Sequence, residues 1–166
     1  MFGYINAINS RLFPLINHIF IFLGHLASTI LVYKITGIAG MKPMARNIAM
    51  VFFYISPCVC GTIFSCDALN QTYSHMWGML AVYSYLVCES KKRYLWWSLF
   101  VMLAALSKDN GITWAIVPPI IAYAFGRESG RSLARNVGIG FLIAIAYVAI
   151  RLSLPHTIIH NGSHIE

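Results

Sequence analysis

The chain has 166 residues, of which 58% are hydrophobic and only 10% charged, and its net charge is +7. A soluble domain carries about 25% charged residues, so this composition excludes an ordinary soluble globular domain. The positive charge does not indicate a nucleic-acid binder, because the Lys and Arg residues occupy short gaps between long apolar runs. The composition and these runs predict an all-α, integral membrane protein.

Six apolar segments follow one another, and we expect each to be a helix, because a helix satisfies its own backbone hydrogen bonds in lipid. They cover about residues 12–33, 47–64, 72–88, 94–106, 112–125 and 137–154. The fourth and fifth are short for a hydrocarbon layer that needs roughly 20 apolar residues, so they either cross a thinned bilayer or form a hairpin that does not fully cross. Pro118 and Pro119 predict a kink or break in the fifth. Residues 1–166 are thus predicted to form a single transmembrane domain, a polytopic bundle of five to six helices.

The basic residues predict the orientation of this bundle. Nine of them lie in three loops that alternate to the same side, namely Lys34, Lys42, Arg46, Lys91, Lys92, Arg93, Arg127, Arg131 and Arg135. The opposite side holds only Arg11, Lys108 and Arg151. Loops rich in Lys and Arg stay in the cytoplasm. We therefore expect the nine to be cytoplasmic, and the N-terminus and the C-terminal tail to be extracytoplasmic.

The stretch ALSKDNGITW, residues 105 to 114, places Lys108 and Asp109 between two apolar segments on the predicted external side. Asn110 and Gly111 favour a turn, and Asp109 or Asn110 could cap the helix that follows. Two interpretations stay open. The turn is either solvated, with an incidental ion pair, or held below the membrane surface, where a charge marks a substrate pathway and a lysine suits a phosphate.

Other polar and aromatic residues in the segments have structural and functional interpretations. His18 and His25 are seven residues apart and share a helix face, where they either line a polar cavity or bond a neighbouring helix. Trp96 and Trp97, close to three basic residues, are typical of an interfacial aromatic belt. The four cysteines, at positions 58, 60, 66 and 88, follow no zinc-ligand spacing, so we expect no metal site and no cofactor. A divalent metal held in another way stays open.

Two stretches resemble membrane glycosyltransferases of the C type (GT-C). NSRLFPLINHIFIFLGHLASTILVY, residues 9 to 33, resembles their R-x-x-N-x-x-x-H type span, which follows the first external loop. ALSKDNGI, residues 105 to 112, resembles their LSKE-x-x-I turn, especially in the protein O-mannosyltransferase-like group. About 140 residues, from near Asn9 to Pro155, follow the same order and spacing of spans.

The resemblance implies a partial GT-C membrane domain with a known chemistry. Dolichyl-phosphate-mannose-protein mannosyltransferases and similar enzymes transfer a sugar from a polyprenyl-phosphate donor to an acceptor on the extracytoplasmic face. The resemblance places Lys108 and Asp109 in the region of the donor phosphate. It places Arg11, Asn17 and His18 on the second span of such an enzyme, as further substrate-binding contacts.

The same resemblance leaves the catalytic residue unassigned. The catalytic acidic residue of the family, which acts as the base, lies in the external loop after the first span, and no span precedes Asn9. We therefore expect an internal or N-terminally truncated piece of a longer enzyme, and activity of the chain alone stays open. The expected partners are the lipid bilayer and a polyprenyl-phosphate-linked sugar donor. The alternative is a small non-enzymatic membrane protein, such as an accessory subunit or a transporter component.

Overall fold

The computed structural model describes residues 13–56 and 68–153, and these residues form helices and no strand. The helices are α2 (Phe13–Ile38), α3 (Pro43–Ile55), α5 (Leu69–Val87), α6 (Ser90–Ser107), the 3-10 helix η2 (Asp109–Ala115), α7 (Val117–Ala124) and α8 (Gly130–Ser153). The prediction of an all-α chain is confirmed for the residues described.

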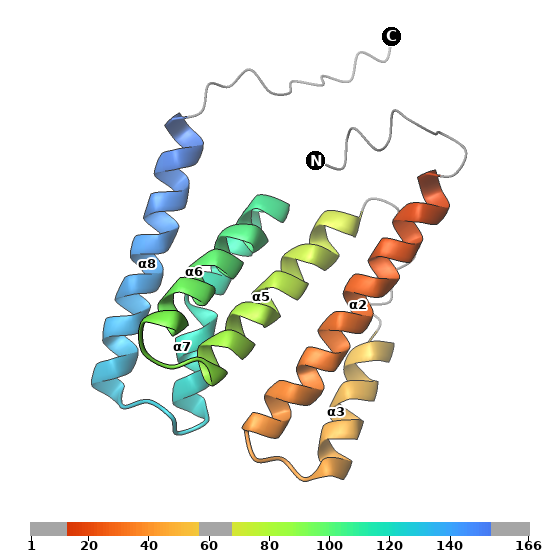
Figure 1. Ribbon diagram of the computed structural model, residues 1–166, viewed down its shortest axis with the longest axis horizontal. Helices are drawn as coiled ribbons and strands as arrows, with labels where there is room; N and C mark the ends of the chain where they lie inside the picture. The colour runs from red at the N-terminus through yellow and green to blue at the C-terminus, as the bar shows by residue number, and fades with distance from the viewer. Residues whose placement is uncertain (1–12, 57–67, 154–166) are drawn as a thin grey trace.

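Four of the helices, α2, α5, α6 and α8, lie side by side, with α2 and α8 at the two edges (Figure 1). The helix α3 packs against α2, and α5 packs against α2, α6 and α7, while η2 lies against α6 and α8. The buried core gathers around α5 and α6 and consists of Ala81, Val82, Tyr85, Leu86, Trp97, Val101, Ala115 and Ala122. The α5–α6 pair is therefore the centre on which the outer helices pack.

The turn from α2 to α3 depends on Gly40. Its φ of 79° lies in the left-handed region, which glycine adopts without a steric penalty. The N–H of Gly40 donates to the carbonyl of Gly37 at 3.0 Å, and the N–H of Met41 donates to that of Thr36 at 3.1 Å. This is the Schellman motif that ends many helices. Pro43 then begins α3, since its fixed φ suits a first helical turn.

The predicted break in the segment over residues 112–125 is confirmed. The chain forms η2 up to Ala115 and begins α7 at Val117, because Pro118 and Pro119 have no N–H with which to continue an α-helical ladder. The prolines stand in the first turn of α7, where no N–H is needed. With 8 residues, α7 is about 12 Å long and does not by itself cross a hydrocarbon layer of about 30 Å.

The other predicted segments match helices with shifted ends. The second begins earlier, at Pro43, and its part from residue 57 on lies outside the described residues. The fourth extends in both directions, to Ser90 and Ser107. Within the described ranges, two helical stretches are long and apolar enough to cross a membrane, Leu15–Ile38 and Gly130–Ser153. Length and composition thus support two spans and not the expected five to six.

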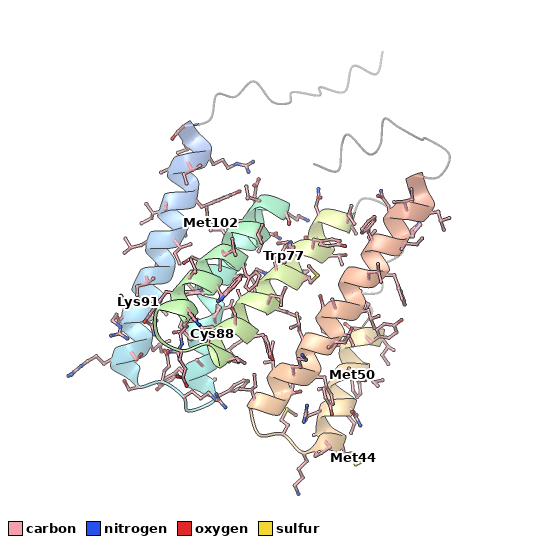
Figure 2. All side chains as sticks on the ribbon, in the orientation of Figure 1. Met44, Met50, Trp77, Cys88, Lys91 and Met102 are labelled. Carbon is pink, nitrogen blue, oxygen red and sulfur yellow. The ribbon has the colours of Figure 1, made fainter. Side chains whose placement is uncertain are left out.

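Both long helices turn apolar side chains outward. Large exposed hydrophobic residues follow α2 (Leu15, Ile19, Phe20, Phe22, Leu23, Leu26, Ile30) and α8 (Phe141, Leu142, Ile145, Val148, Ile150, Leu152). Only 17% of the apolar stretch of α8 is buried. Met44 of α3, which is 75% exposed, also projects away from the bundle (Figure 2). A soluble domain buries most side chains of this kind, so the outer faces of α2 and α8 are more apolar than the surface of such a domain.

The buried face of α2 carries polar side chains beside the apolar Ile21 and Leu31, and its hydroxyl and imidazole groups have partners. Ser28 Oγ donates to the carbonyl of Gly24, and Thr29 Oγ1 to that of His25, both at 2.9 Å. These bonds keep the hydroxyls satisfied inside the helix. The Nε2 of His25 lies 3.1 Å from the carbonyl oxygen of Tyr54, so it donates to the end of α3. Of the two interpretations of His25, this contact favours helix packing over a polar cavity.

The aromatic-belt prediction is wrong for Trp97 and stays a prediction for Trp96. Trp97 is 0% exposed, and its ring meets the ring of Tyr85 edge to face at 5.1 Å. Such pairs add about 0.5–1.5 kcal/mol beyond the area they bury. Trp96 is 41% exposed and stacks on Phe100 at 5.6 Å. Adjacent positions therefore serve the core and the surface, since α6 turns by about 100° per residue.

Gly140 of α8 tests how closely this helix packs on η2. A Cβ on Gly140 would overlap the carbonyl oxygen of Ala115, whereas a Cβ on Gly138 would meet nothing within 4 Å. We expect Gly140→Ala to lower the free energy of unfolding in detergent by about 1–3 kcal/mol, because backbone must move. The matched change Gly138→Ala should be neutral or stabilising, since alanine is the better helix former. Equal effects of the two changes would contradict this contact.

Candidate functional site

The turn that carries Lys108 and Asp109 connects the end of α6 to η2. Lys108 has an extended backbone, with φ −154° and ψ 139°, and the side chains of Lys108, Asp109 and Asn110 are exposed. Gly111 closes the turn, because its N–H donates to the carbonyl of Lys108 at 2.7 Å and a Cβ there would overlap the carbonyl of Ala104. Lys108 stands at the N-cap and no side chain caps η2, so the expected cap by Asp109 or Asn110 is wrong.

Asp109 is tied to α8 through two side chains. Its carboxylate forms an ion pair with the guanidinium of Arg151. The hydroxyl of Tyr147 lies 3.0 Å from the carbonyl oxygen of Ala105 and 3.3 Å from Oδ1 of Asp109, and it accepts from Arg151 Nη1 at 3.1 Å. Tyr147 is buried, whereas the side chains of Arg151 and Asp109 are 59% and 68% exposed. An exposed pair contributes about 0–1 kcal/mol, so the buried tyrosine is the firmer link.

A polar patch on α5 lies beside the same turn. The Nε2 atoms of Gln71 and His75 are 2.6 Å apart, and His75 meets the ring of Trp114 edge to face at 6.0 Å. Trp114 of η2 reaches this place because Gly78 has no side chain, and a Cβ there would overlap the indole. Gly111 of the turn also lies against the side chain of Ser74, the residue before His75. The turn therefore packs beside the polar patch of α5.

The predicted site residues fall into two groups. Lys108 and Asp109 share the turn, which packs against α5, α6 and α8. Asn17 is buried and His18 is half-buried on α2, which packs against α3 and α5. The helix α5 lies between the two groups (Figure 1). Arg11 lies outside the described residues.

A second polar site lies at the other end of the bundle, in the loop between α7 and α8. Gly126 has a φ of 68° and forms another Schellman turn. Its N–H donates to the carbonyl of Tyr123, and the N–H of Arg127 donates to that of Ala122, both at 2.9 Å. This turn ends α7 and directs Arg127 and Glu128 toward the ends of α5 and α6.

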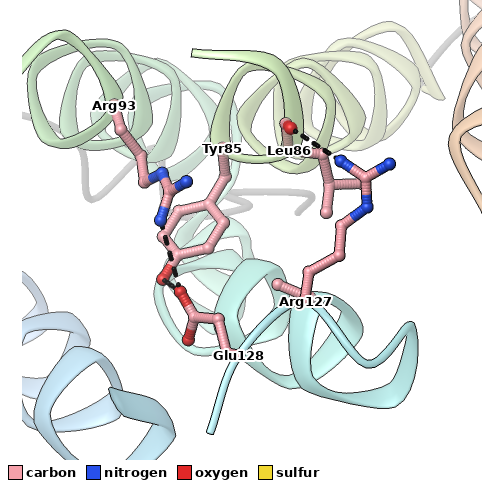
Figure 3. Close-up of a pocket in the computed structure, with 6 residues that line it drawn as sticks. Tyr85, Leu86, Arg93, Arg127 and Glu128 are labelled. Carbon is pink, nitrogen blue, oxygen red and sulfur yellow. Dashed lines mark hydrogen bonds and ion pairs between the residues drawn. The ribbon is translucent and has the colours of Figure 1, made fainter. Parts of the chain in front are cut away.

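Glu128 is the centre of this second site (Figure 3). Its Oε1 accepts from Tyr85 Oη at 2.7 Å, from Arg93 Nη1 at 3.4 Å and from Asn136 Nδ2 at 3.0 Å, and its Oε2 accepts from Asn136 Nδ2 at 3.1 Å. Tyr94 Oη donates to Oδ1 of Asn136 at 3.1 Å. The Glu128 side chain is only 4% exposed. A carboxylate so buried needs the paired charge and hydrogen bonds that these residues supply.

Arg127 joins two helix ends. Its guanidinium donates to the carbonyl of Leu86, near the end of α5, at 3.5 Å and to that of Ile38, the last residue of α2, at 3.1 Å. Arg93 donates through Nε to the carbonyl of Cys88 at 3.2 Å. The last carbonyls of a helix carry partial negative charge, which both guanidinium groups complement.

A cavity of about 270 Å³ lies between these arginines and is lined by Tyr85, Leu86, Arg93, Ala122, Arg127 and Glu128 (Figure 3). In the described part of the chain, no three His, Cys, Asp or Glu side chains come together as metal ligands would. The polar groups of this end therefore surround a cavity lined by two guanidinium groups and by one carboxylate that already accepts several hydrogen bonds.

Most partners of the candidate residues are not evident from the sequence. Arg151 is one of only three cations on the predicted external side, and this rarity is the one signal for a partner of Asp109. Tyr147, one turn before it, carried no sequence signal, because tyrosine is common in apolar helices. Glu128 is a single acidic residue between two arginines in the sequence GRESGR, which reads as a solvated loop. Its burial follows from the turn at Gly126 and from Asn136, which no short motif predicts.

Comparison of the chain with protein-family models, with curated proteins and with solved structures finds no match.

Tyr147 and Tyr123 provide a matched pair for testing the link between α8 and the end of α6. Tyr147→Phe removes a buried hydroxyl and leaves the carbonyl of Ala105 without that donor, so we expect a loss of about 1–3 kcal/mol in the free energy of unfolding. Tyr123→Phe, at a side chain that is 48% exposed, should change it by less than about 0.5 kcal/mol. Unfolding in detergent, followed by tryptophan fluorescence, measures both. A Tyr147→Phe protein as stable as Tyr123→Phe would contradict the link.

Proposed function

We propose that the chain is a multi-pass membrane domain that binds a polyprenyl-phosphate-linked sugar donor, as part of a glycosyltransferase that acts at the extracytoplasmic face. The observation that carries this proposal is an apolar groove that includes Ile112, four residues after Lys108, with Arg151 next to groove residues of α8. The groove, of about 380 Å³, runs between η2 and α8 and is lined by Ile112, Phe141, Ala144, Ile145, Val148, Ala149 and Leu152. A polyprenyl phosphate has the complementary form, an anionic head on an apolar chain.

The head and the chain of such a donor fit the two parts of this region. Arg151 stands between Ala149 and Leu152 on α8, so its side chain leaves the helix at the level of the groove. Lys108 Nζ would bind the phosphate, and Arg151, held by Asp109 and Tyr147, would supply a second cation. Cations at a phosphate leaving group stabilise the charge that develops as the sugar departs. The base that activates the acceptor is unassigned.

Insertion into a membrane is supported by the distribution of polar and apolar side chains. The outer faces of α2, α3 and α8 are apolar, and the buried face of α2 carries Asn17, His25, Ser28 and Thr29. In lipid, apolar side chains face outward at no loss, and polar groups turn toward the bundle interior. With 19 and 18 residues, α5 and α6 are about 28 and 27 Å long, close to the thickness of the hydrocarbon layer.

The return passage after α6 would use two short helices in series. The 7 residues of η2 and the 8 residues of α7 give about 14 and 12 Å of rise, or about 26 Å together. We propose that η2 and α7 share one crossing, with the Lys108 turn at the external end. Asn17 and His18 would add polar contacts on the far side of α5, and Arg11 is expected to belong to the same external region.

Cysteine labelling in whole cells tests the orientation. In a chain whose four cysteines are replaced by alanine, we introduce Asn110→Cys or Lys92→Cys, both at exposed positions at opposite ends of α6. A maleimide that does not cross membranes should label Asn110→Cys in intact cells. It should label Lys92→Cys only after the cells are made permeable, because Lys91 and Arg93, which remain in this variant, retain the start of α6 in the cytoplasm. The reverse pattern, or release of the chain by alkaline carbonate, would refute the proposed topology or insertion.

Binding of a long-chain polyprenyl monophosphate to the purified chain in detergent tests the site. We expect Lys108→Ala to weaken binding about tenfold or more, since hydrogen bonds to charged groups contribute about 1.5–3 kcal/mol. The control Lys92→Ala removes the same charge at the other end and should leave binding within about twofold. The corresponding polyprenol, which lacks the phosphate, should not distinguish the two variants. Equal affinity of the Lys108→Ala and Lys92→Ala chains would favour a non-enzymatic membrane protein.

A further inference from the structure

The cavity at the opposite end of the bundle, about 270 Å³ in volume, has walls of unusual chemistry (Figure 3). Arg93 and Arg127 approach it from α6 and from the loop after α7, and Glu128 and Tyr85 line it between them. A water molecule occupies about 30 Å³ in the liquid, so the cavity has room for several waters or for one small polar group. It is small for a drug-sized ligand, whose pockets measure about 300–1,000 Å³.

The hydrogen-bond donors of the cavity exceed its acceptors. A guanidinium has five N–H groups. Arg93 donates two of its N–H groups, to Cys88 and Glu128. Arg127 also donates two, to Leu86 and Ile38. Each guanidinium therefore has three N–H groups that no described residue accepts. The plane of Arg93 is fixed further, because its guanidinium lies over the ring of Tyr85, 5.0 Å from the centroid.

The carboxylate in the wall does not offer a matching set of acceptors. Glu128 Oε1 already accepts from three donors and Oε2 from one, and a carboxylate has about four lone-pair sites. Its charge is compensated by Arg93 at 3.4 Å. Arg127 faces backbone carbonyls and has no carboxylate partner in the structure's described segments. The balance of charge and of free donors therefore favours an anion over a cation.

We propose that this cavity binds a phosphate group, held by Arg93 and Arg127. A phosphate oxygen accepts the paired N–H groups of a guanidinium, which is why arginine predominates in phosphate recognition. The site is separate from the Lys108 region, because α5 and α6 run the length of the bundle between them (Figure 1). It is a second ligand site, independent of the sugar donor.

The phosphate has two chemical sources, an anionic phospholipid headgroup and free phosphate. The headgroup source rests on the membrane insertion proposed above. The cavity lies at the end of the bundle where α6 begins with Lys91 and Lys92 and α8 begins with Arg131 and Arg135. Basic pockets between helices at a cytoplasmic surface bind anionic headgroups. Free phosphate would need no membrane, so the two sources can be separated by experiment.

Binding of phosphatidylglycerol and of inorganic phosphate to the purified chain tests the inference. Native mass spectrometry in detergent counts retained phosphatidylglycerol, with diacylglycerol as the lipid that lacks the phosphate, and calorimetry measures inorganic phosphate. We expect Arg127→Gln to weaken binding of at least one phosphate compound about tenfold or more. Arg131→Gln, which removes an exposed charge from the same end outside the cavity, should change it less than about twofold.

A second, conservative variant separates phosphate recognition from a folding effect of Arg127→Gln. Arg127→Lys keeps the positive charge and loses the paired N–H groups of the guanidinium, so it should also weaken binding. Loss with phosphatidylglycerol alone assigns a headgroup site, and loss with both compounds assigns a site for phosphate in general. Binding that is unchanged by both cavity variants, or that falls equally in Arg131→Gln, overturns the inference. Because polyprenyl binding is measured through Lys108→Ala, either site can fail without the other.

Discussion

Pro118 and Pro119 constrain everything that follows α6. Neither residue has an N–H, so the chain cannot return from the Lys108 turn as one α-helix. It returns as η2 and then α7, and the break leaves η2 as a short layer against α5, α6 and α8. The close approach of η2 to α8 at Gly140 gives one wall of the apolar groove, and Trp114 reaches α5 over Gly78. The candidate donor region therefore exists because one expected helix is interrupted.

The two ends of the bundle handle charge in different ways. At the Lys108 end, the ion pair of Asp109 with Arg151 is exposed on both sides, so its members can exchange partners with a ligand at little loss. At the Glu128 end, the carboxylate is buried and every contact is with a fixed group from another element. Such a carboxylate holds the surrounding helices together. The two guanidinium groups near it still have N–H groups that no described residue accepts. An exposed ion pair suits reversible binding of a ligand, and a buried carboxylate suits a fixed contact between helices.

The sequence predicted the helical class and the approximate positions of most helices, because long apolar runs depend on local composition alone. It also located the break near Pro118, since the missing N–H is a property of the residue itself. It did not predict that Trp97 is buried while Trp96 is exposed, because that difference depends on which face of α6 meets Tyr85. The partners of Asp109 and Glu128 escaped prediction for the same reason. Contacts such as Tyr147 with Ala105 join residues 42 positions apart, and they are set by helix packing that no single segment encodes.

The contacts of Glu128 also have a consequence for the order in which the chain assembles. Tyr85 belongs to α5, Arg93 to α6 and Asn136 to α8, so the carboxylate gains its last partners only after three helices have met. Until then, removing it from water is strongly unfavourable. During synthesis, the loop that carries Glu128 should therefore remain in water until α8 has been made. The contacts of Glu128 with Tyr85, Arg93 and Asn136 would then form late in folding, after α5, α6 and α8 have come together.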